Sequence, residues 1–186
     1  MELYLVRHSS VNVEKGTCYG QWDVALADTF TQEIASLKVQ IPETFDIVYS
    51  SPLSRCNIMA KELQKSDILE DKRLLEMHFG DWENKNWDDL NSDELTKWMD
   101  DFVNQRTPNG ENLVDLADRV KSFITYLRTT DAQKVLIVTH AGVIRCFIAL
   151  LLKVPYENIF KLSIDYCQVV KINLGSTEAE DLLLKL

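Results

Sequence analysis

The sequence predicts an α/β fold, a three-layer α/β/α sandwich built on a mostly parallel central sheet. Short apolar runs of strand length alternate along the chain with longer segments of helical periodicity, which is the pattern of such folds. At 186 residues, of which 46% are hydrophobic, the chain is long enough to bury one complete core. We therefore expect a single domain over residues 1–186.

The first predicted strand covers residues 3–6, an apolar run of the kind that is buried on both faces of a sheet. Arg7 and His8 follow it at once. In open α/β sheets, ligands bind just beyond the carboxyl ends of the strands. The pair is therefore a candidate site, and the alternative is two surface residues after a strand. Residues 9–27 then form a predicted loop of the length that is usually functional.

Residues 30–40 have helical character, and residues 46–49 form a second apolar run that predicts a strand. Ser51 is the predicted N-cap of the next helix, with Pro52 at its first position. Arg55 then falls in the first turn, where the helix dipole disfavours a cation. A cation in this unfavourable position, close to the end of a strand, indicates that Arg55 belongs to a functional site. The alternative is an ordinary surface arginine.

Residues 68–76 predict a short strand that ends at Glu76. The segment 77–111 is rich in tryptophan and acidic residues, with a helical stretch around 92–104, and is too long for a plain crossover. We interpret it as an insertion that covers the site. His78 follows Glu76 by two residues and is interpreted as a partly buried histidine near the rim.

A second strand ends in the same way as the first. Asn112 is predicted to cap a helix over residues 113–129, and the apolar strand that follows, 134–139, leads directly into His140. Because the carboxyl ends of parallel strands share one edge, we expect His140 to lie close to His8. The remaining predicted elements are a helix over 143–152 and strands over 164–174 and 182–186.

Charge and composition exclude several classes of protein. The formal net charge is −9, from 20 basic and 29 acidic residues, which argues against a nucleic-acid or anionic membrane partner. The apolar runs are too short to span a bilayer. Because no basic region precedes an apolar stretch at the N-terminus, we expect no signal peptide. Four scattered cysteines without a C-x-x-C pair fit a reduced, cytoplasmic location. The histidines lack metal-ligand spacing, so we expect no metal and no cofactor.

Four short blocks together resemble the histidine phosphatase superfamily, the phosphoglycerate-mutase-like fold. They are Arg7-His8 and residues 50–56, 75–83 and 139–142, in the family's order and spread over most of the chain. The resemblance implies a metal-independent phosphomonoesterase with a phosphohistidine intermediate. It assigns His8 as the nucleophile and Glu76 as the general acid. Arg7, Arg55 and His140 bind the phosphate in this assignment, and His140 also counts as a catalytic residue.

The loop after the first strand departs from the family pattern. Glu14 stands where the family has an asparagine that contacts phosphate, so Ser9 and Asn12 are candidate replacement donors. Gly20 is a further candidate for the pocket. Residues 18–23 are most similar to α-ribazole-5′-phosphate phosphatases, which act in cobalamin nucleotide-loop assembly.

The first functional hypothesis is therefore hydrolysis of α-ribazole 5′-phosphate or another small phosphorylated metabolite. Three alternatives stay open: a phosphoglycerate mutase, another small-molecule or phosphohistidine phosphatase of the superfamily, and a non-catalytic binding module on the same scaffold. The presence of all five core residues favours an enzyme, and the short chain favours a hydrolase over a mutase. The sequence makes no prediction about oligomerisation.

Overall fold

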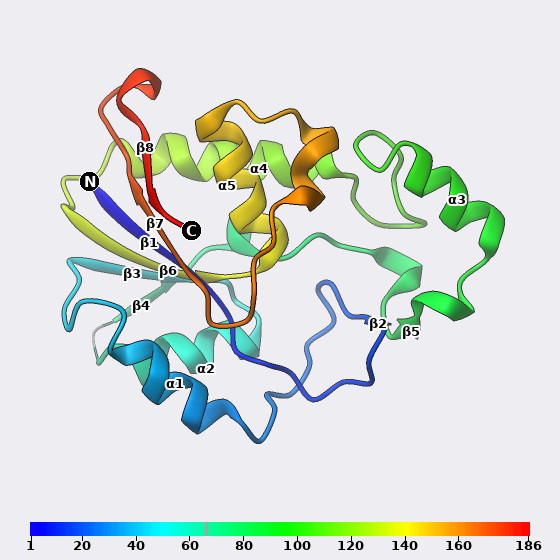
Figure 1. The fold of residues 1–186 in the computed structure, drawn as a ribbon, viewed down its shortest axis with the longest axis horizontal. Helices are drawn as coiled ribbons and strands as arrows, with labels where there is room; N and C mark the ends of the chain where they lie inside the picture. The colour runs from blue at the N-terminus through cyan, green and yellow to red at the C-terminus, as the bar shows by residue number, and fades with distance from the viewer. Residues whose placement is uncertain (66) are drawn as a thin grey trace.

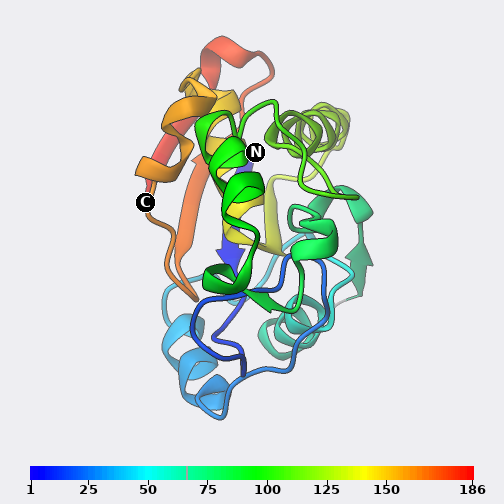
Figure 2. The same cartoon turned by 90° about the vertical axis from the view of Figure 1, so that its right-hand side faces the viewer.

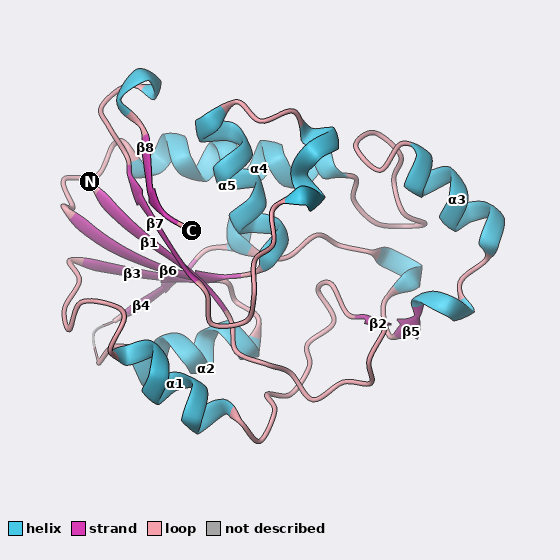
Figure 3. Ribbon diagram, in the orientation of Figure 1, coloured by secondary structure: helices cyan, strands magenta, loops and turns pink. Residues whose placement is uncertain are grey.

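A six-stranded sheet lies between two layers of helices, as the computed structural model shows for residues 1–65 and 67–186 (Figures 1 and 3). The strand order is β4-β3-β6-β1-β7-β8. This is the predicted three-layer α/β/α sandwich. The strands of the sheet are β1 (Glu2–Arg7), β3 (Ile47–Ser50), β4 (Ile68–Glu70), β6 (Lys134–Thr139), β7 (Val169–Asn173) and β8 (Leu182–Lys185).

Five strands of the sheet run in the same direction, and β7 runs opposite to them, because it pairs antiparallel with both β1 and β8. β1 and β3 both pair with β6 in parallel, whereas β7 pairs antiparallel with β1. The register places Arg7 beside Thr139, so the residues that come next, His8 and His140, leave the sheet at the same edge. Because β7 runs the other way, the loop that precedes Val169 also lies at this edge.

Helices cover both faces of the sheet (Figure 2). The α-helices are α1 (Phe30–Lys38), α2 (Ser54–Leu63), α3 (Ser92–Asp100), α4 (Leu113–Leu127) and α5 (Ala141–Leu152). Strand residues alternate between two cores: Leu3 and Leu5 pack with α4 and α5, whereas Tyr4 and Val6 pack with α1 and α2. β1 is thus buried on both faces, as its apolar run predicts.

The shorter elements connect these layers. The 3₁₀-helices are η1 (Lys72–Leu74), η2 (Gly80–Trp82), η3 (Trp87–Asp89), η4 (Tyr156–Lys161) and η5 (Glu178–Glu180). The predicted cap of α4 is present. The Asn112 side chain accepts from the backbone N–H of Asp115, and the Asp115 carboxylate accepts from the backbone N–H of Asn112. In the described part of the chain, no helix combines the length and the apolar character needed to cross a bilayer.

Two predicted strands are shorter than expected. β4 ends at Glu70, because the Asp71 carboxylate accepts from the backbone of Arg73 and starts η1. Glu76 therefore lies in an irregular segment and not on a strand. The predicted strand over 164–174 begins only at Val169, because Cys167 has a φ of 56° and turns the chain just before it.

The predicted cap of α2 is wrong. The helix begins at Ser54, and Leu53 occupies the N-cap position without a side-chain hydrogen bond. The Ser51 hydroxyl instead lies 2.8 Å from Nε2 of His140, across the sheet edge. Arg55 does fall in the first helical turn, as predicted.

The segment 77–111 leaves the three layers and carries α3 at one end of the molecule (Figures 1 and 2). Its aromatic side chains pack mainly on one another, with ring centroids of Trp82, Trp87 and Trp98 separated by 5.7–6.1 Å. The short strands β2 (Thr17–Cys18) and β5 (Lys85–Asn86) pair antiparallel. This pairing joins the loop 9–27 to the segment.

Candidate active site

His8 occupies the centre of the site, at the end of β1. Its side chain is 1% exposed, and Nδ1 lies 2.8 Å from the carbonyl oxygen of Ser9. A carbonyl can only accept, so Nδ1 carries the proton and Nε2 keeps a free lone pair. Burial, followed by the nearby Arg55 guanidinium, holds the pKa of His8 well below its usual 6.5. The ring is therefore neutral at pH 7 and suited to act as a nucleophile.

His140 lies beside His8, as the sequence predicts, with the ring centroids 5.1 Å apart. Nη2 of Arg55 lies 3.3 Å from Nδ1 of His140, and a guanidinium can only donate. Nε2 of His140 therefore carries the proton and donates to the Ser51 hydroxyl at 2.8 Å. Burial and Arg55 also hold the pKa of His140 well below 6.5.

Arg55 is fully buried, although it sits where a helix dipole disfavours a cation. Two carbonyls of the loop 9–27 compensate: Nη2 donates to Gly20 at 2.6 Å and Nη1 donates to Trp22 at 3.0 Å. The described residues form no salt bridge with Arg55. A buried cation with no carboxylate partner favours the binding of an anion.

Arg7 is held by the segment of chain that precedes β7. Its Nη1 donates to the Ile164 carbonyl at 2.7 Å, and its guanidinium lies 3.8 Å from the ring centroid of Tyr166. The Tyr166 hydroxyl lies 3.0 Å from that of Tyr19. The centroids of these two rings lie 5.6 and 6.3 Å from the centroid of His8. An aromatic pair thus flanks His8.

Unpartnered polar atoms are concentrated in this site. In the described part of the chain, four buried side-chain polar atoms have no hydrogen-bond partner. Three of them belong to predicted site residues, namely Nε of Arg7, Oγ of Ser9 and Nε of Arg55, and the fourth is Nε1 of Trp98. A buried donor without a partner costs about 1–3 kcal/mol, so an oxyanion that accepts from these atoms would be stabilised here.

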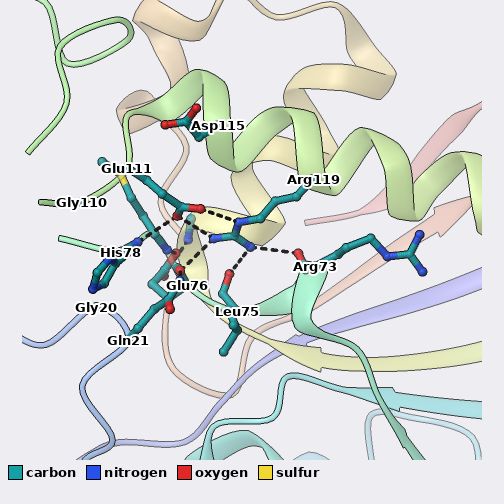
Figure 4. Close-up of polar contacts among 12 residues, drawn as sticks. Gly20, Gln21, Arg73, Leu75, Glu76, His78, Gly110, Glu111, Asp115 and Arg119 are labelled. Atoms are coloured by element: carbon teal, nitrogen blue, oxygen red, sulfur yellow. Dashed lines mark hydrogen bonds and ion pairs between the residues drawn. The ribbon is translucent and has the colours of Figure 1, made fainter. Parts of the chain in front are cut away.

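Glu76 is tied to the same edge of the sheet through its carboxylate. Oε1 accepts from the backbone of Met77 at 2.9 Å, and Oε2 accepts from the backbone of Gly142 at 3.0 Å. Gly142 lies in the first turn of α5, two residues after His140. A Cβ at Gly142 would lie only 2.2 Å from Oε1 of Glu76, so the close approach requires glycine. Figure 4 shows Glu76 among the polar groups that surround it.

Three residues singled out in the sequence lie apart from this group. Asn12 and Glu14 are exposed and line, together with Trp22, a cavity of about 500 Å³ that none of the residues Arg7, His8, Arg55 or His140 lines. His78 is partly buried, as interpreted, and its backbone bonds to Glu111.

Sequence reasoning missed several residues that contact the site. Ser51 precedes a proline, and this pattern predicts a helix N-cap and not a contact with His140. Tyr166 falls in a run that predicts a strand. Tyr19 belongs to the block 18–23 that carries the finer family resemblance, but nothing in the sequence places its side chain beside His8. Within residues 1–65 and 67–186, no group of three or more His, Cys, Asp or Glu side chains is arranged to hold a metal ion.

Two arginines and two neutral histidines gather at the carboxyl edge of the parallel strands, so the chain is an α/β protein with a candidate site centred on histidine and lined by cations. The chain belongs to the histidine phosphatase superfamily (branch 1), whose family model matches residues 3–184.

Individual relatives carry the names of phosphatases. A Hydrogenobacter thermophilus protein named as a phosphoserine phosphatase is 30% identical over 180 residues, which is 92% of this chain and 89% of the relative. An adenosylcobalamin/alpha-ribazole phosphatase of Salmonella typhimurium is 30% identical over 174 residues, with coverage of 89% and 86%. Proteins named as phosphoglycerate mutases also match, including one from Escherichia fergusonii at 27% identity, with coverage of 96% and 87%.

The alpha-ribazole phosphatase of Shigella flexneri has a crystal structure that matches this fold closely. The TM-score is 0.91 at 27% sequence identity, and the match covers 100% of this chain and 96% of the other. The phosphoglycerate-mutase-like architecture that the four sequence blocks imply is thereby confirmed.

Proposed function

We propose that this phosphatase of the histidine phosphatase superfamily hydrolyses small phosphomonoesters through a phosphohistidine at His8, without a metal. The observation that carries the proposal is a buried, neutral histidine set among three unpartnered donors, from Arg7, Ser9 and Arg55. These donors suit the oxygens of one phosphoryl group, since guanidinium groups bind phosphate through paired N–H donors.

In the first half-reaction, Nε2 of His8 attacks phosphorus and the P–O bond to the alcohol breaks. The hydrogen bond from Nδ1 to the Ser9 carbonyl stabilises the positive charge that develops on the ring. Arg7 and Arg55 stabilise the charge on the phosphoryl oxygens, and positioned donors of this kind contribute most of the catalysis in phosphoryl transfer. Protonated Glu76 donates its proton to the leaving oxygen, so the product is a neutral alcohol.

In the second half-reaction, water attacks the phosphohistidine. The Glu76 carboxylate accepts a proton from that water, the P–N bond breaks, and His8 returns to its neutral form as inorganic phosphate leaves. Glu76 is again protonated, so the cycle is balanced in protons. The same carboxylate serves as acid and then as base, which requires that its position be fixed throughout.

We propose α-ribazole 5′-phosphate as the substrate. The support comes from relatives named as alpha-ribazole phosphatases, found in both the sequence and the structure comparisons. The relative named as a phosphoserine phosphatase makes phosphoserine the second candidate. The segment 77–111 is proposed to cover the bound alcohol, because Glu83 of this segment accepts from the backbone of Gln21 in the loop 9–27 at 2.9 Å.

The decisive experiment is a rapid quench with ³²P-labelled substrate under conditions that preserve phosphohistidine. Label is expected on His8, and His8→Ala should abolish both the label and turnover while the protein stays folded. Label on any other residue would overturn the mechanism. A panel with α-ribazole 5′-phosphate, phosphoserine and 3-phosphoglycerate plus 2,3-bisphosphoglycerate then separates the phosphatases from a mutase.

A further inference from the structure

Glu76 lies on a stretch of chain that no regular element holds. The residues between η1 and η2, 75–79, belong to no helix and no strand. A strand residue is fixed by its ladder of backbone hydrogen bonds, and this segment lacks one. The position of the proposed general acid therefore depends on side chains that bind the backbone around it.

Arg119 of α4 supplies three of those bonds (Figure 4). Its Nη1 donates to the carbonyl of Arg73 at 2.9 Å and to the carbonyl of Leu75, and its Nη2 donates to the carbonyl of Glu76 at 2.8 Å. One guanidinium thus binds three carbonyls within four consecutive residues. Its planar shape lets it hold them in a fixed relation, which an ammonium group cannot do.

Glu111 fixes the guanidinium and also binds the backbone on the other side of Glu76. Its two carboxylate oxygens accept from Nε and Nη2 of Arg119, both at 3.0 Å. Oε2 also accepts from the backbone of His78 at 2.9 Å, and the Glu111 backbone donates to the His78 carbonyl at 2.7 Å. The ion pair is mostly buried, with side chains 16% and 21% exposed.

We propose that Arg119, oriented by Glu111, is a positioning residue that places Glu76 for proton transfer to the leaving group. The inference rests on the proposed role of Glu76 as general acid. Arg119 touches only the backbone of Glu76, whereas Met77 and Gly142 bind its carboxylate. Loss of Arg119 should therefore move the carboxylate without removing it, and a displacement of about 1 Å can cost roughly 10²-fold in rate.

The test measures the rate of phosphohistidine formation by rapid quench. It compares the variants Arg119→Lys and Glu111→Gln with the unchanged protein. α-Ribazole 5′-phosphate has an alkoxide leaving group that needs a proton, whereas p-nitrophenyl phosphate does not. We expect the rate on the alkyl ester to fall about 10- to 100-fold and the rate on the aryl ester to fall less than about threefold. On a Glu76→Gln background, Arg119→Lys should have no further effect on the alkyl ester.

The chain offers a matched control at the C-terminal end of the same helix. Arg128 pairs with Asp181 and donates to the Gly175 carbonyl, and its side chain is 17% exposed, close to the 16% of Arg119. Arg128→Lys should lower the melting temperature by a similar amount, since it weakens a comparable ion pair. The ratio of the two ester rates should not change.

The outcomes separate this inference from the proposed function. If the unchanged protein forms no phosphohistidine from either ester, the function itself has failed. If Glu76→Gln selectively slows the alkyl ester but Arg119→Lys and Glu111→Gln slow both esters equally, or neither, the positioning role is rejected. Should Arg119→Lys fail to fold, Glu111→Gln, which preserves side-chain size, decides the question.

Discussion

Replacing Gly142 by alanine is expected to displace the Glu76 carboxylate while leaving the fold intact. The added Cβ would lie 2.2 Å from Oε1 of Glu76 and 3.1 Å from its Cδ. Ordinary contacts need about 3.5 Å, so the carboxylate must retreat by about 1 Å. The third neighbour, Cδ2 of Leu116 at 3.2 Å, is the end of a flexible side chain and can adjust.

The expected changes in rate and in stability differ widely. A shift of about 1 Å in a reacting group costs roughly 10²-fold in rate, which is about 2.7 kcal/mol of transition-state stabilisation. In a helix, alanine is favoured over glycine by about 1 kcal/mol, and the weakened bond from the Gly142 backbone to Glu76 costs about as much. The free energy of unfolding should therefore change by less than about 1 kcal/mol.

The assay is the phosphorylation step on an alkyl ester, measured alongside urea unfolding of the same preparation. A double-mutant cycle with Glu76→Gln tests the cause, because Gly142→Ala should add little once the carboxylate is already impaired. Retention of activity within about threefold would refute the reasoning, since it would mean that the position of Glu76 does not limit the rate.

Three further predictions concern the charge of Arg55, the protonation of the two histidines and metal independence. Arg55→Ala should lower kcat/KM by about 10²–10⁴-fold in steady-state assays, and a change below threefold would mark Arg55 as structural. Because the folded-state pKa values of His8 and His140 lie below 6.5, the unfolded chain binds more protons in acid. The free energy of unfolding should therefore fall as the pH drops below 6.5, by up to about 1.4 kcal/mol per pH unit for each histidine. His8→Gln should reduce that slope in urea titrations between pH 7 and 5. EDTA should leave turnover unchanged; loss of activity that Mg²⁺ or Zn²⁺ restores would contradict metal independence.

The main layout of the site was predictable because it depends on strand ends. Two apolar runs, each followed by a histidine, were sufficient to place His8 and His140 at one edge of the sheet. Arg55 was predictable for a different reason, since a cation in the first turn of a helix is unfavourable without a compensating partner. Both signals are local in sequence, so no tertiary information was needed.

The residues that sequence reasoning missed act across long sequence distances. Arg119 contacts the backbone 43–46 residues before it, and Ser51 meets a histidine 89 residues away. In the sequence, Arg119 is one more polar residue on an amphipathic helix, and a serine before a proline resembles a helix cap. Only the packing of α4 and β6 against their neighbours gives these side chains their partners.

The tethering of the loop 9–27 limits how the substrate preference of this protein can be re-engineered. Adjacent residues of the loop bind two different residues of the proposed mechanism, because the carbonyl of Gly20 accepts from Arg55 and the side chain of Gln21 donates to the carbonyl of Glu76. Gly20 also has a φ of +34°, and a Cβ there would lie 2.4 Å from Oε1 of Glu83. A loop grafted from a relative with another substrate must therefore keep this dipeptide, or the graft will displace both Arg55, the proposed phosphate-binding residue, and Glu76, the proposed general acid.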